Sequence, residues 1–188
     1  ISFTGELSYE INVPARYGAA LWSTLMKAGA PFGLTPYGTE AMHVLRAEKG
    51  FIIVGQETDG TVTPLDLGMD WIVSKTKTDF IGKRALERVS MADPQRKQLV
   101  GLMTDDPNKV IPEGVHAVLD PDQPAPMAML GHVTSSYFSP NLGHYIAMGL
   151  LKGGHELMGQ TVYIPMLDGK TPIKARITDT RFYDAKGD

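Results

Sequence analysis

The sequence predicts an α+β chain in which a mixed α/β part precedes a small antiparallel β-barrel or sandwich. Apolar residues recur at helical spacing in two segments of the first half. Short β-type runs separated by turn residues follow one another in the second half. Between them, residues 90–98 are polar around Asp93-Pro94 and have the composition of a linker. We therefore place a boundary near residue 95, with domains 1–94 and 95–188.

The composition fits an ordinary globular protein and excludes several functions. The chain has 188 residues, of which 43% are hydrophobic and 21% charged, so intrinsic disorder is not expected. A net charge of −3 without a long Lys/Arg cluster argues against nucleic-acid or anionic-membrane partners. The sequence has no Cys, which excludes disulfides, thiolate metal sites and a cysteine nucleophile. It also has no apolar run of membrane-spanning length, so we expect a cytoplasmic protein.

The first part of the chain predicts two short β segments and a helix. Residues 1–13 predict two β segments, with Thr4-Gly5-Glu6 between or within them. Pro14 then opens a helix, because proline is preorganised for a first turn, and Gly29 ends it. Its apolar stripe consists of Leu21, Trp22, Leu25 and Met26.

A second helix is bounded by Thr35 as its N-cap, Pro36 at its first position and Gly50 at its end. Residues 51–54 then predict a strand. Apolar residues alternate over 65–71, but residues 63–66 could equally begin one helical turn. Residues 71–73 predict a further strand with Trp71 in the core, and residues 80–89 a short basic helix.

The remaining sequence predicts six strands of the barrel or sandwich. Turns rich in Gly, Pro, Asp and Asn separate the β-type runs, as is typical of antiparallel β domains. The six runs are residues 99–103, 115–119, 127–134, 145–151, 161–164 and 173–178.

Common catalytic and metal-binding patterns are missing from the sequence. The five His residues show no metal-ligand spacing, so no metal site is expected. No Gly-x-Ser-x-Gly motif occurs, and Ser135-Ser136 is expected in a turn or at a strand end. Neither type of glycine-rich phosphate loop follows a strand, and Gly153-Gly154 is expected in a turn.

Two carboxylates near the start are candidates for ligand binding. Glu6 and Glu10 project to the same face if their segment is extended, beside Phe3 and Tyr9. A carboxylate on an apolar strand needs hydrogen-bond donors, and the NH and amino groups of an aminopyrimidine would supply them. An exposed carboxylate, or one paired with Arg46, explains the same spacing. Arg46 is equally ambiguous, because a basic residue near a helix end is favourable whatever its function.

Three stretches carry a resemblance to the aminomethyltransferase family, whose type member is the T-protein of the glycine cleavage system. They are Thr4-Gly5-Glu6 through Glu10, the helix end Leu45-Arg46-Ala47-Glu48-Lys49-Gly50, and Thr63-Pro64 through Trp71 with Phe80-Ile81-Gly82 after it. Within this family the chain is similar to the C-terminal region of the α subunits of heterotetrameric sarcosine oxidases. Three further stretches carry that likeness: 37–50, 131–137 and 182–184.

The resemblance implies the later portion of a T-protein-like, folate-binding α/β domain followed by a small antiparallel β-barrel. It implies tetrahydrofolate as the ligand, with Glu10 gripping the pterin and Phe3, Tyr9 and Arg46 as further binding residues. In the intact oxidase, the one-carbon unit of oxidised sarcosine passes to tetrahydrofolate and gives 5,10-methylenetetrahydrofolate. Flavin and NAD, and the other oxidase subunits, are expected outside this chain.

The chain also departs from the family's pattern at several positions. The family's catalytic Asp lies upstream of Thr4-Gly5-Glu6, so no catalytic residue is expected here and the chain is expected to be an inactive piece of a longer polypeptide. Met42 stands where the T-protein has a folate-binding Arg, and Phe3 where some relatives have Tyr. Two alternatives remain: a subunit-docking module without folate function, and a free aminomethyltransferase of the glycine cleavage type. Exposed apolar surface, and hence association or poor stability, is expected of such a piece.

Overall fold

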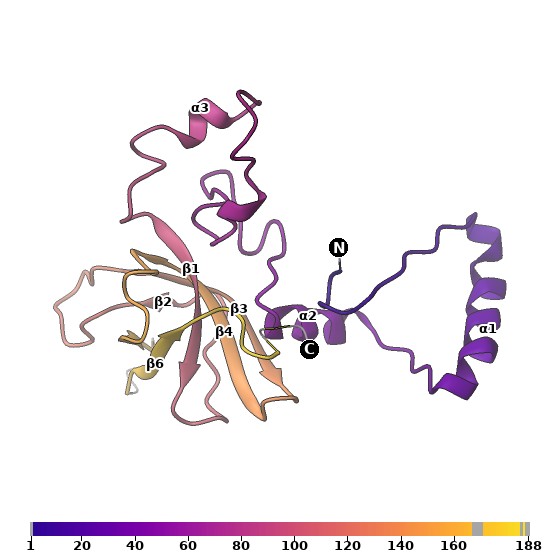
Figure 1. The fold of residues 1–188 in the computed structure, drawn as a ribbon. Coiled ribbons are helices and arrows are strands. Elements are labelled where there is room, and N and C mark those ends of the chain that lie inside the picture. The colour runs from indigo at the N-terminus through magenta and orange to yellow at the C-terminus, as the bar shows by residue number, and fades with distance from the viewer. Residues whose placement is uncertain (1, 167–170, 185, 187–188) are drawn as a thin grey trace.

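The strands of the second half form one antiparallel sheet (Figure 1). The computed structural model describes residues 2–166, 171–184 and 186. Across the sheet the strands follow the order β2-β3-β4-β1-β6-β5. They are β1 (Lys97–Thr104), β2 (His116–Ala117), β3 (Gly131–Ser139), β4 (His144–Lys152), β5 (Thr161–Ile164) and β6 (Ile173–Thr178).

A bridge between the two outermost strands closes the sheet into a barrel. Val118, directly after β2, and Tyr163 of β5 exchange two backbone hydrogen bonds of 2.8 and 2.9 Å. Closure satisfies the backbone groups of strands that would otherwise be sheet edges. The predicted antiparallel barrel is therefore confirmed.

The barrel interior is filled by alternating apolar residues. On β6, Ile173, Ala175 and Ile177 are buried, while Lys174 and Arg176 between them are exposed, as the period of a strand requires. β1 and β4 are instead buried on both faces, and helix α2 (Thr39–Glu48) covers part of the outer face at β3 and β4. A second apolar cluster, with Leu99, Met148 and Ala47 of α2, lies there.

The structure corrects two of the predicted strands. The run 127–134 is displaced, because β3 spans Gly131–Ser139 and places Ser135 and Ser136 inside the strand, not in a turn or at its end. At Gly131 a Cβ would lie 1.9 Å from the Leu150 carbonyl oxygen, so glycine is required where β3 meets β4. The run 115–119 reduces to β2 and the bridging Val118. The remaining four runs lie within β1 and β4 or coincide with β5 and β6.

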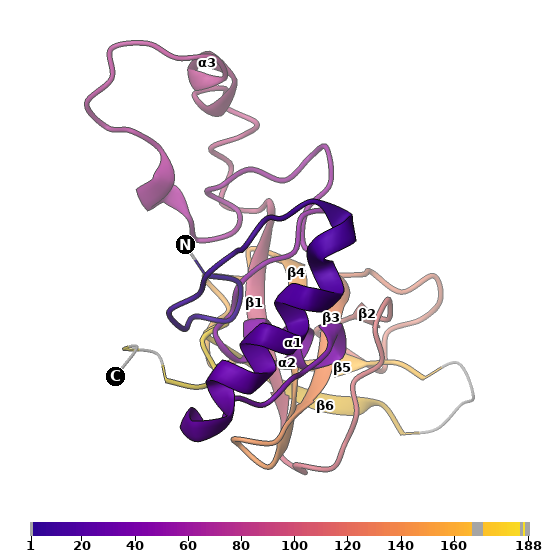
Figure 2. The ribbon, with the colours of Figure 1, turned by 90° about the vertical axis from the view of Figure 1, so that its right-hand side faces the viewer.

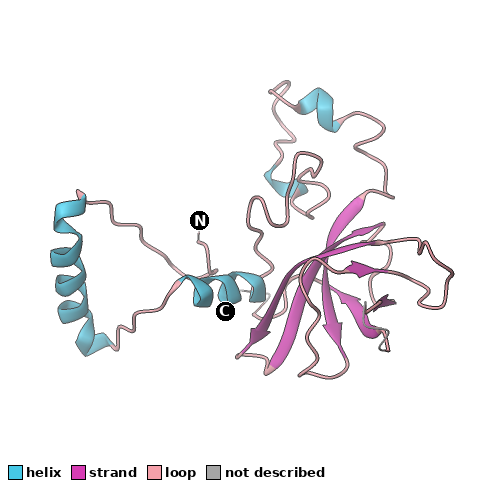
Figure 3. Cartoon of the chain, turned by 180° about the vertical axis from the view of Figure 1, so that it is seen from behind, coloured by secondary structure: helices cyan, strands magenta, loops and turns pink. Residues whose placement is uncertain are grey.

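Within the first half, the part that carries α1 (Gly18–Gly29) reaches away from the barrel as an arm, whereas α2 lies against the sheet (Figures 1 and 2). The regular elements of the first half are the 3₁₀ turns η1 (Ala15–Tyr17), η2 (Ala30–Phe32) and η3 (Asp70–Ile72), and the helices α1, α2 and α3 (Lys83–Leu86). Every residue of α1 is at least partly exposed, and Figure 3 shows this helix apart from the sheet. Among the described residues, no helix is long and apolar enough to cross a bilayer.

Several predictions for the first half are wrong. Residues 2–13, all of them described, form no strand, because no neighbouring strand pairs with their backbone; residue 1 lies outside the described residues. Residues 51–54 are also not a strand. Instead, Gly50 takes a φ of 72°, and the Phe51 N–H caps α2 by donating to the Arg46 carbonyl at 2.9 Å. The open segment 63–66 forms turns, in which the Asp66 N–H donates to the Thr63 carbonyl.

Other elements are shorter or more exposed than predicted. Trp71 lies in η3 with its side chain 73% exposed, so it is not a core residue. The helix predicted over 80–89 is the single turn α3, and α2 begins at Thr39 after Gly38, not after Thr35. Arg96, in the predicted linker, donates to Asp66 and to the Thr61 carbonyl, which ties this segment to the loop before it. The boundary between 94 and 95 stays a prediction.

Candidate functional site

The last turn of α2 carries a buried charged residue. Arg46 has no exposed surface, because α2 lies against β3 and β4. One end of its guanidinium, Nη1, donates to the Phe51 carbonyl and to Glu57 Oε2, both at 3.0 Å, and forms an ion pair there. The other end, Nη2, donates to Ser135 Oγ on β3 at 2.7 Å. Arg46 therefore joins α2, the following loop and the barrel at one point.

Glu57 is the counter-charge of this cluster and is also fully buried. Its Oε2 accepts the Ile53 N–H at 2.7 Å in addition to Arg46, and its Oε1 accepts the Ser135 hydroxyl. Burying two charges is compensated only when their remaining donors and acceptors are bonded. Arg46, Glu57 and Ser135, which we call the Arg46 cluster, meet that condition except at Arg46 Nε, which has no partner within the described part of the chain.

A line of rings connects the Arg46 cluster to the surface. The Arg46 guanidinium carbon lies 5.5 Å from the centre of the Tyr137 ring, within cation–π range. The Tyr137 and His43 ring centres are 6.4 Å apart, and those of His43 and Phe3 are 6.5 Å apart. The line ends at Phe3, whose side chain is 43% exposed. The structure thus brings two of the four predicted binding residues, Phe3 and Arg46, onto one line of contacts, through His43 and Tyr137.

The other two predicted binding residues lie in an exposed segment. Tyr9 is 83% exposed. Glu10 is also exposed, and within the described residues its carboxylate accepts only the Asn12 amide, at 3.4 Å. The alternative in which Glu6 or Glu10 pairs with Arg46 is wrong, because the ion-pair partner of Arg46 is Glu57.

The turn before this segment is firmly built. Ser2 Oγ accepts the N–H groups of Thr4 and Gly5 at 3.3 and 3.0 Å, and Thr4 is buried. Gly5 has a φ of 89°, a backbone conformation that glycine adopts without strain. The motif Thr4-Gly5-Glu6 is therefore a turn, and the residues that follow it, including Glu10, are exposed.

A second buried carboxylate, that of Glu48, lies two residues after Arg46 on α2. It accepts the Ser139 hydroxyl and, at 2.8 Å, the Asn141 amide. These donors come from the end of β3 and the turn after it, so Glu48 fixes α2 to the β3–β4 hairpin. Sequence reasoning missed Glu57, Ser139 and Asn141 as partners, because each lies in a stretch with no distinctive motif.

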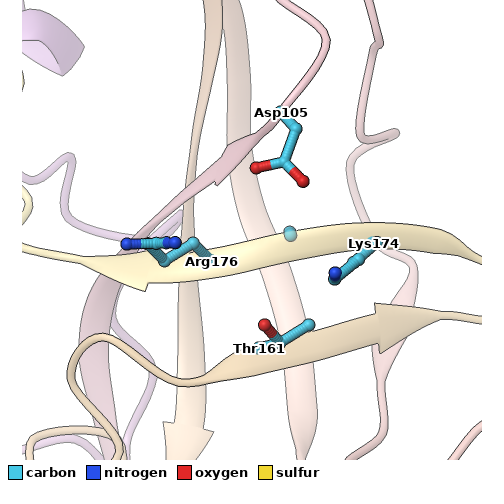
Figure 4. Close-up of a pocket in the computed structure, with 5 residues that line it drawn as sticks. Asp105, Thr161, Lys174 and Arg176 are labelled. Carbon is cyan, nitrogen blue, oxygen red and sulfur yellow. The ribbon is translucent and has the colours of Figure 1, made fainter.

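Two pockets elsewhere on the chain do not include these residues. A cavity of about 240 Å³ lies between the 59–62 loop and the barrel, lined among others by Asp59, Lys97 and His132. Burial lowers the pKa of His132, as do the nearby Lys97 and His116. A smaller hollow of about 30 Å³ on the outer face of β5 and β6 is lined by Asp105, Thr161, Lys174 and Arg176 (Figure 4). Among the described residues, no group of three His, Asp or Glu side chains could hold a metal ion.

The fold and the buried cluster define a class of protein: a closed antiparallel barrel onto which an N-terminal segment is fixed by a helix end with a buried ion pair. Two family models match the sequence of these two parts. The GCVT N-terminal domain matches residues 1–77, and the glycine cleavage T-protein C-terminal barrel domain matches residues 97–184. Together the two models match most of the chain, which therefore belongs to the glycine cleavage T-protein family.

Named relatives refine this assignment. The chain is 46% identical over 186 residues to sarcosine oxidase subunit alpha of Corynebacterium sp. strain P-1, covering 98% of this chain and 18% of the relative. It is 33% identical over 181 residues to aminomethyltransferase of Thermoanaerobacter pseudethanolicus, covering 96% of this chain and 46% of the relative. The crystal structure of aminomethyltransferase T from Bartonella henselae matches with a TM-score of 0.81 at 26% identity, covering 98% of this chain and 48% of that one.

The chain thus spans about half the length of the aminomethyltransferases, and less than a fifth of the sarcosine oxidase subunits, that it matches. The resemblance inferred from the motifs is confirmed, as is the fold that it implies.

Proposed function

We propose that the chain is the tetrahydrofolate-binding region of a sarcosine oxidase alpha subunit. In the intact enzyme this region passes the one-carbon unit of oxidised sarcosine to tetrahydrofolate, which leaves as 5,10-methylenetetrahydrofolate. One observation carries the proposal: identity to three subunits of that name is 39–46% over nearly the whole chain, against 33–34% for aminomethyltransferases. Flavin and NAD binding then belong to other parts of the enzyme, and the other subunits are the partners.

The exposed residues of the N-terminal segment fit a folate. Tetrahydrofolate supplies the amine nitrogens that accept the carbon, while the protein must bind and orient its pterin. The Glu10 carboxylate accepts a single hydrogen bond within the described residues, so it keeps acceptor sites for the NH and amino groups of a pterin. Phe3 and Tyr9 offer ring surface on the same segment.

Arg46 has a different part in this proposal. Because it is fully buried, it acts on the ligand indirectly, by holding Tyr137, which in turn contacts His43 beside Phe3. Met42, which replaces the family's folate-binding arginine, leaves the pterin contacts to Glu10 and the exposed rings.

The proposal is tested by Glu10→Gln in the intact enzyme, with tetrahydrofolate binding measured by calorimetry. The substitution preserves shape and removes the charge, so the loss of a charged hydrogen bond of roughly 1.5–3 kcal/mol should raise the Kd about tenfold to a hundredfold. The matched control is Glu87→Gln, because Glu87 is exposed and lies at the end of α3; this variant should leave the Kd unchanged. An unchanged Kd in Glu10→Gln would contradict the role of Glu10, and a wild-type enzyme that does not bind folate would refute the function.

A second function, subunit docking without folate binding, is favoured by the surface of the arm. Trp22 and Leu25 on α1 are 58% and 40% exposed, and Phe32 after it is 88% exposed. An apolar surface of this kind is typical of an interface. Capture of the other oxidase subunits by the chain, together with an assembled enzyme that never binds tetrahydrofolate, would favour docking over the proposed function.

A further inference from the structure

The C-terminal tail of the barrel closes over the end of α2. After β6, the N–H groups of Phe182 and Tyr183 both donate to the Glu48 carbonyl at 2.9 Å. The tail also lies directly on Gly50, where a Cβ would be 2.6 Å from the Thr180 carbonyl oxygen. The tail is therefore seated on the helix end that carries the Arg46 cluster.

Lys49 links this tail to the N-terminal turn. Its ammonium group donates to the carboxylate of Asp184 and, at 3.3 Å, to the Asp184 carbonyl, and the two side chains are only 11% and 20% exposed. The methylene groups of Lys49 pass over Gly5, where a Cβ would lie 2.8–3.0 Å from Cε, Cγ and Cδ. The hydrogen bond to Asp184 raises the pKa of Lys49, and the charge of Glu6 acts in the same direction, so the ammonium stays charged.

The segment that carries Glu10 has few other contacts to hold it. Among residues 2–10, all of them described, Thr4 is the one buried side chain, and Phe3 contacts His43. Residues 5–10, from the turn onward, are exposed. The direction in which the segment leaves the barrel therefore depends on Thr4, Phe3 and the Lys49 side chain that lies over Gly5.

We propose that Lys49, held by Asp184, is a positioning residue for segment 2–10, so that the C-terminal tail of the barrel forms part of the folate site. This inference rests on the proposed function, because Glu10 is placed there as the pterin-binding residue. Lys49 itself does not contact the ligand. It fixes the turn from which the Glu10 segment starts, and Asp184 fixes Lys49.

The experiment compares Lys49→Met, Lys49→Arg and Asp184→Asn in the intact enzyme, with two readouts. The first is amide hydrogen exchange of residues 2–10 without folate, which reports on the segment whatever it binds. The second is the Kd for tetrahydrofolate. Lys75→Met is the matched control, because Lys75 is 79% exposed and its pairing with Asp70 is 3.4 Å long.

We expect faster exchange of residues 2–10 and a Kd raised about tenfold in Lys49→Met and Asp184→Asn, with Lys49→Arg near wild type. If Lys49→Arg keeps both readouts near wild type, the positive charge at this position, and not the exact packing of the lysine side chain, positions the segment. The control should change neither readout.

Unchanged exchange in both Lys49→Met and Asp184→Asn would overturn the proposal. The proposal would also be overturned if these two variants showed faster exchange but an unchanged Kd, while Glu10→Gln weakened tetrahydrofolate binding in the same assay. A wild-type enzyme that binds no tetrahydrofolate would overturn the proposed function and with it the ligand role of the tail, and the exchange rates would still show whether the tail holds the segment.

Discussion

Glu57→Gln is a small change that the structure predicts to be strongly destabilising. The side chain keeps its volume but loses its charge, and the fully buried Arg46 loses its counter-ion. Breaking a buried ion pair by neutralising one partner costs about 3–5 kcal/mol, because the remaining charge stays in a low-dielectric site. Arg46 keeps the Phe51 carbonyl and the Ser135 hydroxyl, so we expect a loss of about 3 kcal/mol in the free energy of unfolding.

Urea unfolding followed by circular dichroism measures this loss, with Glu87→Gln as the exposed control. The double variant Arg46→Met/Glu57→Gln should recover much of the stability, because it removes both charges and leaves no ion unpaired. A loss below about 1 kcal/mol in Glu57→Gln, or a double variant that is less stable than either single one, would refute the reasoning that the ion pair is closed to water.

Two further predictions concern the loop before the barrel and the barrel itself. The Asp66 pKa is lowered: burial would raise it, but the hydrogen bonds from Arg96 and Thr63 outweigh burial. Its stabilising effect is therefore present above the unfolded-state pKa of about 3.9 and lost as the pH falls through the lower folded pKa. Between pH 5 and 2, urea unfolding should show that Asp66→Asn loses less stability on acidification than the wild type does. Equal slopes of the unfolding free energy against pH in the two proteins would contradict this. Gly131→Ala should prevent the pairing of β3 and β4, because its Cβ would lie 1.9 Å from the Leu150 oxygen, and a native circular dichroism spectrum would contradict that expectation.

The predictions that the structure confirmed depend on local sequence patterns. β5 and β6 have the predicted bounds, because alternation with period two and the turns beside them are visible within a few residues. The motif around Arg46 likewise marked the helix end on which the Arg46 cluster is built.

The predictions that were wrong required knowledge of neighbours. Residues 2–13 and 51–54 have strand-like composition but no strand beside them, and a strand without a partner leaves its backbone unsatisfied. Trp71 looks like a core residue by its type alone, yet it lies on the exposed turn η3.

The sequence by itself determined the family, the antiparallel barrel and the candidate residues Phe3, Tyr9, Glu10 and Arg46. Only the tertiary structure decided what Arg46 touches, because its partner Ser135 lies 89 residues further along the chain and no local pattern links the two. The same holds for Lys49 and Asp184, which are 135 residues apart. Contacts between buried polar groups depend on how the chain folds back on itself, and that information is spread over the whole sequence.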